Sequence, residues 1–209
     1  MDTSARPGRT KVERSTLLRA AADIFFEQGY AATSIDAIIE RAGGSKRNIY
    51  SEFGNKEGLF TAIVTEHLEK ALSALAMEDV ESRDLRGTLT AFGRQLLDVL
   101  LSPALIGVYR TVVIENARFP ELVQKFYNHG PGRASARLAE VLEEAQRRGE
   151  IQVVDCAQAA DHFSGMIRGN LHLQVVLGLR PPPEDMEAQA IVDSAVEIFI
   201  GGVWNRGAG

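Results

Sequence analysis

The residues from Ser45 to Phe53, SKRNIYSEF, combine hydrogen-bond donors with a narrow apolar stripe. Ile49 and Phe53 are four residues apart and would share one side of a short helix. The other side would carry donors: Lys46, Arg47, Asn48 and Ser51. Lysine and arginine can bind guanine edges or phosphates, asparagine can pair with adenine, and serine is permissive. This composition suits a surface that reads double-stranded DNA.

A polar helix face is by itself more often a solvated surface, so the interpretation depends on the neighbouring segments. The residues TSIDAIIERAGG predict a preceding helix, which Thr33 or Ser34 can cap. Gly43-Gly44 ends that helix, and Ser45 can cap the next one. Two short helices joined by a tight glycine turn form a helix-turn-helix, whose second helix enters the major groove.

Contacts to the DNA backbone are expected on both sides of this second helix. Tyr50 and Lys56 lie at its flanks, where phosphate contacts are made. The free N–H groups at the helix starts near Thr33–Ser34 and Asn55 also suit phosphate.

Side chains that could support catalysis are few. None of the four histidines, at positions 67, 129, 162 and 172, follows an acidic residue by three positions, which removes the usual di-iron bundle signature. The sequence has no phosphate-binding glycine loop. The single cysteine, Cys156, excludes an internal disulfide and a Cys-based zinc site. The chain is therefore predicted to be no enzyme and to have no catalytic residues, no metal site and no cofactor.

Helical periodicity predicts an all-α fold of about nine helices. The expected ranges are 11–28, 34–42, 46–52, 56–77, 82–101, 103–118, 120–148, 156–179 and 184–203. Gly130-Pro131-Gly132 must kink or interrupt the helix over 120–148. Only the short EIQVV has a strand-like pattern.

Charge is divided unevenly along the chain. Residues 1–56 carry a net charge of +2, which leaves −7 for the remainder of a chain whose total is −5. A mildly basic end joined to an acidic body suggests a division of labour. The sequence has no membrane-length apolar run and no signal-peptide core, so we expect a cytoplasmic protein with no membrane partner.

Residues 11–64 resemble the DNA-binding domain of the tetracycline-repressor (TetR) family of bacterial transcription regulators. The resemblance rests on AADIFFEQGYAATSIDAIIERAGGSKRNIYSEFGNKEGLF, with its alanine-rich first helix ending in GY and its NKEGLF start of a fourth helix. Further on, VVIENARFPELVQKFYNHGPGR resembles the C-terminal domain of the AefR-like branch. The resemblance implies a homodimeric, ligand-responsive repressor that binds a double-stranded DNA operator.

The resemblance also implies domains and site residues. It places a flexible basic arm at 1–10, the DNA-binding domain at 11–55, and the effector-binding and dimerisation domain at 56–209. The DNA-contacting positions that it implies are Thr33, Ser34, Ser45, Lys46, Arg47, Asn48, Tyr50, Ser51 and Lys56. Arg47 departs from the family pattern, which usually has a small residue there.

A cavity between the later helices is the expected site for a small, largely apolar effector. Candidate lining residues are aromatic or polar: Phe92, Tyr109, Ile114, Glu115, Asn116, Phe126, Tyr127, His129, Phe163, Met166 and His172. For each aromatic residue, packing in the core is the alternative. Asn116 and His129 are the expected polar anchors.

The last two helices have more apolar positions than one core-facing side needs. Those expected in a dimer interface are Leu171, Val175, Ile191, Ala195 and Ile198, with Leu179, Ala188 and Phe199 nearby. A dimer is needed to place two reading heads on DNA. The rival hypothesis is a helical ligand carrier or enzyme whose N-terminal bundle is only structural, and such a protein has no need for Lys46, Arg47 and Asn48 together.

Overall fold

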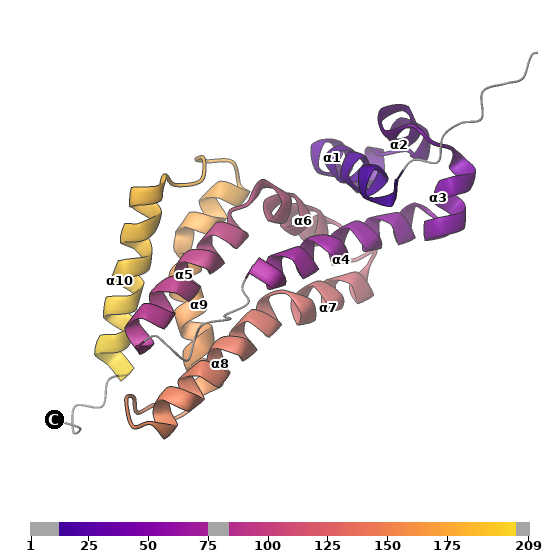
Figure 1. The fold of residues 1–209 in the computed structure, drawn as a ribbon. Helices are drawn as coiled ribbons and strands as arrows, with labels where there is room; N and C mark the ends of the chain where they lie inside the picture. Colours follow the sequence, from indigo (N-terminus) through magenta and orange to yellow (C-terminus); the bar gives the residue numbers. More distant parts are fainter. Residues whose placement is uncertain (1–12, 75–83, 204–209) are drawn as a thin grey trace, which may run out of the picture.

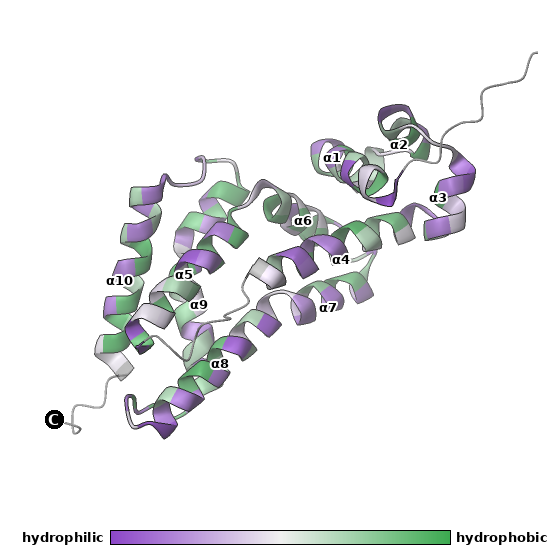
Figure 2. Cartoon of the chain, viewed as in Figure 1, coloured by the Kyte–Doolittle hydropathy of each residue, from purple (hydrophilic) through white to green (hydrophobic). Residues whose placement is uncertain are grey.

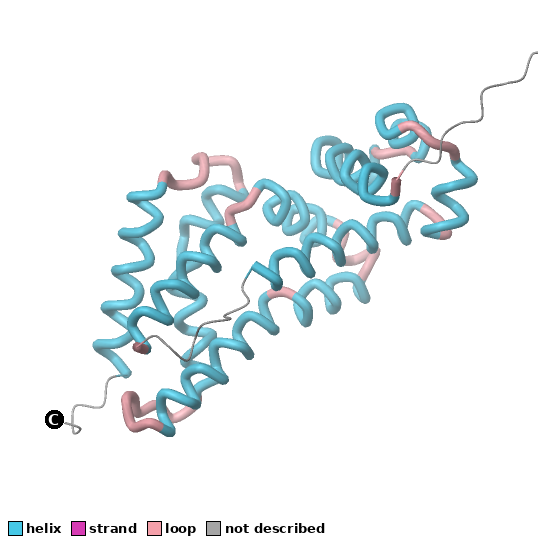
Figure 3. Tube along the Cα trace, viewed as in Figure 1, coloured by secondary structure: helices cyan, strands magenta, loops and turns pink. Residues whose placement is uncertain are grey.

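The computed structural model describes residues 13–74 and 84–203, and every element assigned there is a helix (Figures 1 and 3). The helices are α1 (Arg14–Ala32), α2 (Ile35–Ala42), α3 (Lys46–Phe53), α4 (Lys56–Ala74), α5 (Leu85–Leu100), α6 (Pro103–Ile114), α7 (Pro120–His129), α8 (Pro131–Arg147), α9 (Cys156–Val176) and α10 (Asp185–Val203). The all-α prediction is confirmed. The arm expected at residues 1–10 lies outside the described residues.

Serine caps and glycine turns set the limits of α2 and α3. Ser34 Oγ and Ser45 Oγ each accept a hydrogen bond from the backbone N–H three residues on, at 3.1 Å and 3.3 Å. Each cap satisfies an N–H group that has no partner inside its helix. Gly43 and Gly54 follow the two helices at φ 79° and 78°, a left-handed conformation that suits glycine. The predicted caps and stops of both helices are therefore present.

An aromatic cluster fixes α1, α2 and α3 to the start of α4. Phe25 and Phe60 are fully buried, with ring centroids 5.2 Å apart, and Tyr30 lies 5.2 Å from Phe60. Ile38 of α2 and Ile49 of α3 are buried in the same cluster. Full burial of such a side chain stabilises the fold by about 1.5–3 kcal/mol. We call the unit formed by α1, α2 and α3 the head.

A second core lies among α5, α8, α9 and α10, which pack against one another (Figure 1). Phe163 lies at its centre, with its ring centroid 6.4 Å from that of Phe92 and 5.1 Å from that of Phe199. Apolar and polar residues alternate around these helices (Figure 2). The helices from α5 to α10 form the second unit, which we call the body.

Helix α6 packs into both cores. Ile106 belongs to the core of the body, whereas Val108 and Val112 belong to the cluster that also holds the head. The ring of Phe26 in α1 lies directly on the backbone of Gly107, where an added Cβ would meet ring atoms at 2.6–2.9 Å. Helix α6 therefore joins the head to the body.

The helix predicted over 120–148 is interrupted, as expected. Gly130 has φ −113° and ψ −103°, which lies outside the helical region, and Pro131 begins α8. Proline fits the first turn of a helix because its missing N–H would be unpaired there in any case. The break brings the described residues to ten helices. Helix α9 ends at Val176, earlier than the predicted 179, because Gly178 turns the chain at φ 73°.

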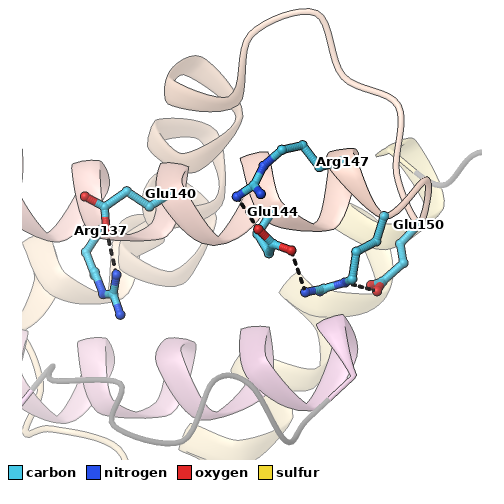
Figure 4. Close-up of polar contacts among 6 residues, drawn as sticks. Arg137, Glu140, Glu144, Arg147 and Glu150 are labelled. Atoms are coloured by element: carbon cyan, nitrogen blue, oxygen red, sulfur yellow. Dashed lines mark hydrogen bonds and ion pairs between the residues drawn. The ribbon is translucent and has the colours of Figure 1, made fainter.

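The outer helix faces are polar. Along α8, Arg137 pairs with Glu140, and Glu144 pairs with Arg147 and Arg148 (Figure 4). Exposed pairs of this kind contribute about 0–1 kcal/mol each, so we interpret them as a solvated surface. No described helix alone is long and apolar enough to cross a membrane; α5 and α6 pass that test only as a pair bent by 64°.

Candidate nucleic-acid interface and cavity

Helix α3 lies at the edge of the molecule, with its apolar side on the head (Figure 1). Ile49 is 1 % exposed and Phe53 is half-buried against the same cluster. Asn48 is half-buried at the turn side. The outward-facing side chains of α3 are exposed: Lys46, Arg47, Tyr50 and Ser51. The structure thus places the predicted donors Lys46, Arg47 and Ser51 on one open surface, with the half-buried Asn48 at its edge; we call this surface the α3 face.

Lys46 forms an ion pair on this face. Its Nζ lies 2.8 Å from Asp36 Oδ1 of α2, and both side chains are more than half exposed. The hydrogen bond to Asp36 raises the pKa of Lys46, so the ammonium group stays charged. Because exposed pairs are weak, this contact orients Lys46 without preventing it from binding a phosphate or a base.

Thr33 and Ser34 differ in what they present to solvent. Thr33 is 2 % exposed, and its hydroxyl donates to the Gly29 carbonyl at 2.8 Å. That hydroxyl stabilises the kinked end of α1 and does not face solvent. Ser34 is exposed at the start of α2. Of the two alternatives from sequence, only Ser34 is therefore exposed to solvent.

Lys56 at the start of α4 contacts an aromatic ring. Its Nζ lies 4.4 Å from the ring centroid of Tyr30 and 3.4 Å from the Ala31 carbonyl. Arg118, from the turn after α6, lies 5.1 Å from the same ring. Partial burial and the charge of Arg118 lower the pKa of Lys56. A phosphate near Lys56 would favour its charged form.

Arg14 is a residue of this surface that sequence reasoning missed. Its guanidinium lies 3.2 Å from Glu52 of α3 and 3.3 Å from Glu66 of α4, and 5.8 Å from the Phe53 ring centroid. It therefore ties α3 to α1 and α4 and neutralises an acidic side chain beside the α3 face. Its position before the first apolar repeat gave no signal for this role.

A cavity of about 350 Å³ lies between α4 and the body. Its walls come from α4 to α9, and most of them are apolar: Leu68, Leu96, Val99, Leu105, Phe126 and Ala134. Four residues named from sequence line it: Tyr109, Phe126, Tyr127 and His172. The Tyr109 ring lies edge-on to His172, with ring centroids 4.9 Å apart.

The other candidate lining residues lie elsewhere. Phe92 and Phe163 are completely buried in the core, and Met166 packs half-buried against it, so the core alternative holds for these three. Asn116 and His129, the expected anchors, are exposed and bond to backbone carbonyls of their own helical turns. Ile114 and Glu115 also lie outside the cavity. Sequence cannot show which side of a helix meets a cavity when both sides carry polar groups.

Most of the polar groups of the cavity come from α9. Asp161, Ser164, Arg168 and His172 line it together with Gly165. Their spacing of three or four residues places the first three along one side of the helix, and His172 lies beyond a kink at Gly169, where φ is 45° and ψ is −155°. Sequence reasoning named only His172, although this polar repeat within a helix was a usable signal.

The expected dimer residues divide into two groups. Val175 and Ala195 are buried in the chain's own core, and Leu171 and Ile191 are half-buried against it. Ile198 is 66 % exposed. Other apolar side chains of α9, α10 and their connection are also exposed: Leu173, Leu177, Leu179 and Met186.

Comparison with known families covers both parts of the chain. Residues 17–63 match the family described as bacterial regulatory proteins, tetR family. Residues 87–202 match the AefR-like transcriptional repressor, C-terminal domain.

Individual relatives match over nearly the whole chain. The HTH-type transcriptional regulator YvkB of Bacillus subtilis is 29 % identical over 191 residues, covering 90 % of this chain and 95 % of that protein. The structure of the flavonoid-responsive regulator FrrA is 32 % identical, with a TM-score of 0.76, covering 92 % and 97 %. A TetR family transcriptional regulator from Pseudomonas syringae pv. tomato is 25 % identical, with a TM-score of 0.74, covering 93 % and 98 %.

Proposed function

This chain belongs to the tetR family of bacterial regulatory proteins, with an AefR-like C-terminal domain, and we propose that it is a dimeric repressor released from its operator by a small molecule. It is a DNA-binding transcriptional regulator and not an enzyme. The proposal concerns the contacts, the dimer and the effector.

The observation that carries the DNA contacts is the α3 face. Lys46, Arg47, Asn48 and Ser51 read base edges, and Ser34, Ser45, Tyr50 and Lys56 bind the DNA backbone. The buried Ile49 holds α3 on the head, so the donors need little reordering when they bind. Thr33 contributes its backbone rather than its hydroxyl.

The exposed apolar surface of α9 and α10 supports a dimer. Leu173, Leu177 and Ile198 are more than half exposed. In a two-fold dimer the same patch covers itself, and two heads reach successive major grooves one helical turn apart.

The position of α6 supports regulation by a ligand. Leu105 and Tyr109 line the cavity, while Gly107 between them contacts Phe26 of the head. A ligand that displaces α6 therefore changes the position of the head. Such a ligand releases DNA when it binds more tightly to the state whose heads are wrongly spaced. The name of the similar regulator FrrA, flavonoid-responsive, is consistent with small-molecule control.

DNA binding can be tested with the DNA upstream of the protein's own gene, searched for an inverted repeat. Fluorescence anisotropy should show operator binding by the wild type and its loss when Lys46, Arg47, Asn48 and Tyr50 are all alanine. A variant with alanine at the exposed Arg137, Glu140 and Arg147 and the half-buried Glu150 of the body is the control. Unchanged operator affinity in a folded α3 variant would refute the proposal.

A further inference from the structure

The polar wall of the cavity carries one negative and one positive side chain, and both are exposed. Asp161 and Arg168 both line the cavity from α9. They are seven positions apart, which is about 10 Å along a helix, and no ion pair joins them in the described part of the chain. Among the described residues, no ion pair is found for Arg168 with any acidic group. One end of the cavity therefore favours a negative group and the other disfavours it.

Two hydrogen-bonding groups line the cavity with Arg168: Ser164, one turn before it, and His172, beyond a kink in α9 at Gly169. Ser164 Oγ is buried and has no hydrogen-bond partner among the described residues. Buried hydroxyls normally have partners, because an unpaired one is costly. His172 is 5 % exposed, and its burial, together with the charge of Arg168, lowers its pKa. A neutral imidazole can donate one hydrogen bond to a ligand.

We propose that the cavity binds an organic anion, whose acidic group contacts Arg168, Ser164 and His172. The apolar body of the ligand packs among Leu96, Val99, Leu105 and Phe126. Asp161 sets the orientation because it repels the acidic group from the opposite end. This inference rests on the proposed function in assigning the cavity as the effector site, and it narrows the effector from largely apolar molecules to organic acids.

Arg168 is exposed, so water shields its guanidinium in part, yet beside the apolar walls it still attracts an anionic partner. Arginine also binds planar anionic groups such as carboxylates through two parallel N–H donors. A purely apolar ligand would leave the buried Ser164 hydroxyl without a partner.

A matched pair of fluorescent probes tests the proposal. 8-Anilinonaphthalene-1-sulfonate and N-phenyl-1-naphthylamine share one aromatic skeleton, and only the first is an anion. Both are titrated into the full-length protein at constant ionic strength. Variants for comparison are Arg168→Gln, Arg168→Lys, and Arg137→Gln as a control that removes the same charge from the surface of α8.

A fourth variant shows whether the probes occupy the cavity. An added Cβ at Gly165 meets nothing within 4 Å, although this residue lines the cavity. Gly165→Leu therefore fills the cavity without a clash at Cβ. It should abolish binding of both probes.

The wild type should bind the anionic probe more tightly than the neutral one. Arg168→Gln should weaken binding of the anionic probe about tenfold or more and leave binding of the neutral probe unchanged. Arg168→Lys should retain part of the preference, and Arg137→Gln all of it. Equal binding of both probes to wild type and Arg168→Gln, with loss of both in Gly165→Leu, would overturn the proposal.

Operator binding by the wild type, measured with and without each probe, separates this inference from the proposed function. If only the anionic probe releases the protein from the operator, both the anion site and ligand-controlled repression are supported. Binding of the anionic probe through Arg168 without release supports the anion site and contradicts ligand-controlled repression. Equal release by both probes supports repression and overturns the anion site.

Discussion

Single residues of the DNA-binding surface differ in the kind of contact that they can make. Lys56 has a flexible stem and contacts the Tyr30 ring, so it can move to a phosphate without disturbing α4. Asn48 lies at the turn side of α3, half-buried, and its position is fixed by the capped first turn. The first is suited to a contact that is independent of sequence, and the second to a base.

Substitutions of these two residues should therefore weaken DNA binding in different ways. Lys56→Gln should weaken binding to operator and to random DNA by similar factors. It should also reduce the slope of the logarithm of the binding constant against the logarithm of the salt concentration by about 0.9. Asn48→Ala should cost about 1–3 kcal/mol on the operator and relax the preference at one base pair per half-site. Anisotropy titrations over a salt series measure both effects.

Lys70→Gln is the matched control for Lys56, because Lys70 is an exposed lysine on the same helix that pairs with Glu66. It removes the same charge away from the α3 face and should leave the salt slope nearly unchanged. Equal slopes for Lys56→Gln and the wild type would show that Lys56 does not bind a phosphate.

At the scale of helices, α1 and α6 can approach closely because Gly107 has no side chain. Alanine in a helix is normally more stable than glycine by up to about 1 kcal/mol. At Gly107 the new Cβ would lie 2.6 Å from Phe26 Cγ, so the ring must move. Gly107→Ala should therefore bring no gain, and we expect a loss of about 1 kcal/mol or more.

Gly165→Ala is the comparison, because the space around its Cβ is open and the usual gain should appear. Urea unfolding measures both variants. In a Phe26→Leu background, Gly107→Ala should no longer destabilise the protein, since the two changes share one contact. A stabilising Gly107→Ala in the wild-type background would show that Phe26 moves away freely.

Local chemistry explains which elements were predictable. The limits of α2 and α3 followed from Ser34, Ser45 and the glycines after each helix, because caps and turns depend on neighbouring residues. The cavity did not follow, because the sides of α6 and α9 that meet are decided by contacts between distant residues. The expected anchors Asn116 and His129 therefore lie outside the cavity, whereas Ser164 and Arg168 line it.

At the scale of the whole molecule, the exposed apolar patch of α9 and α10 indicates which substitution should dissociate the proposed dimer. Ile198→Glu would place a charge twice in a two-fold interface. The dissociation constant of the dimer should therefore rise at least about 100-fold. Sedimentation velocity over a dilution series measures it.

Val154→Glu is the control, because Val154 is also a fully exposed apolar residue but lies in the loop before α9. It should leave the dimer intact. A charge at Val175 would test the chain's own core instead, since that residue is 6 % exposed. A dimer that survives Ile198→Glu would place the interface on another surface.

Helix α4 runs without interruption from Lys56 at the DNA side to Leu68 at the cavity wall. Twelve residues of helix span about 18 Å, so a tilt of about 5° at the cavity moves Lys56 by about 1.6 Å. A hydrogen bond to phosphate tolerates a change of only about 0.5 Å in length. In the proposed dimer, two-fold symmetry would double the relative displacement of the heads, so the helix would act as a lever and a small shift of one cavity wall would be expected to misplace both heads.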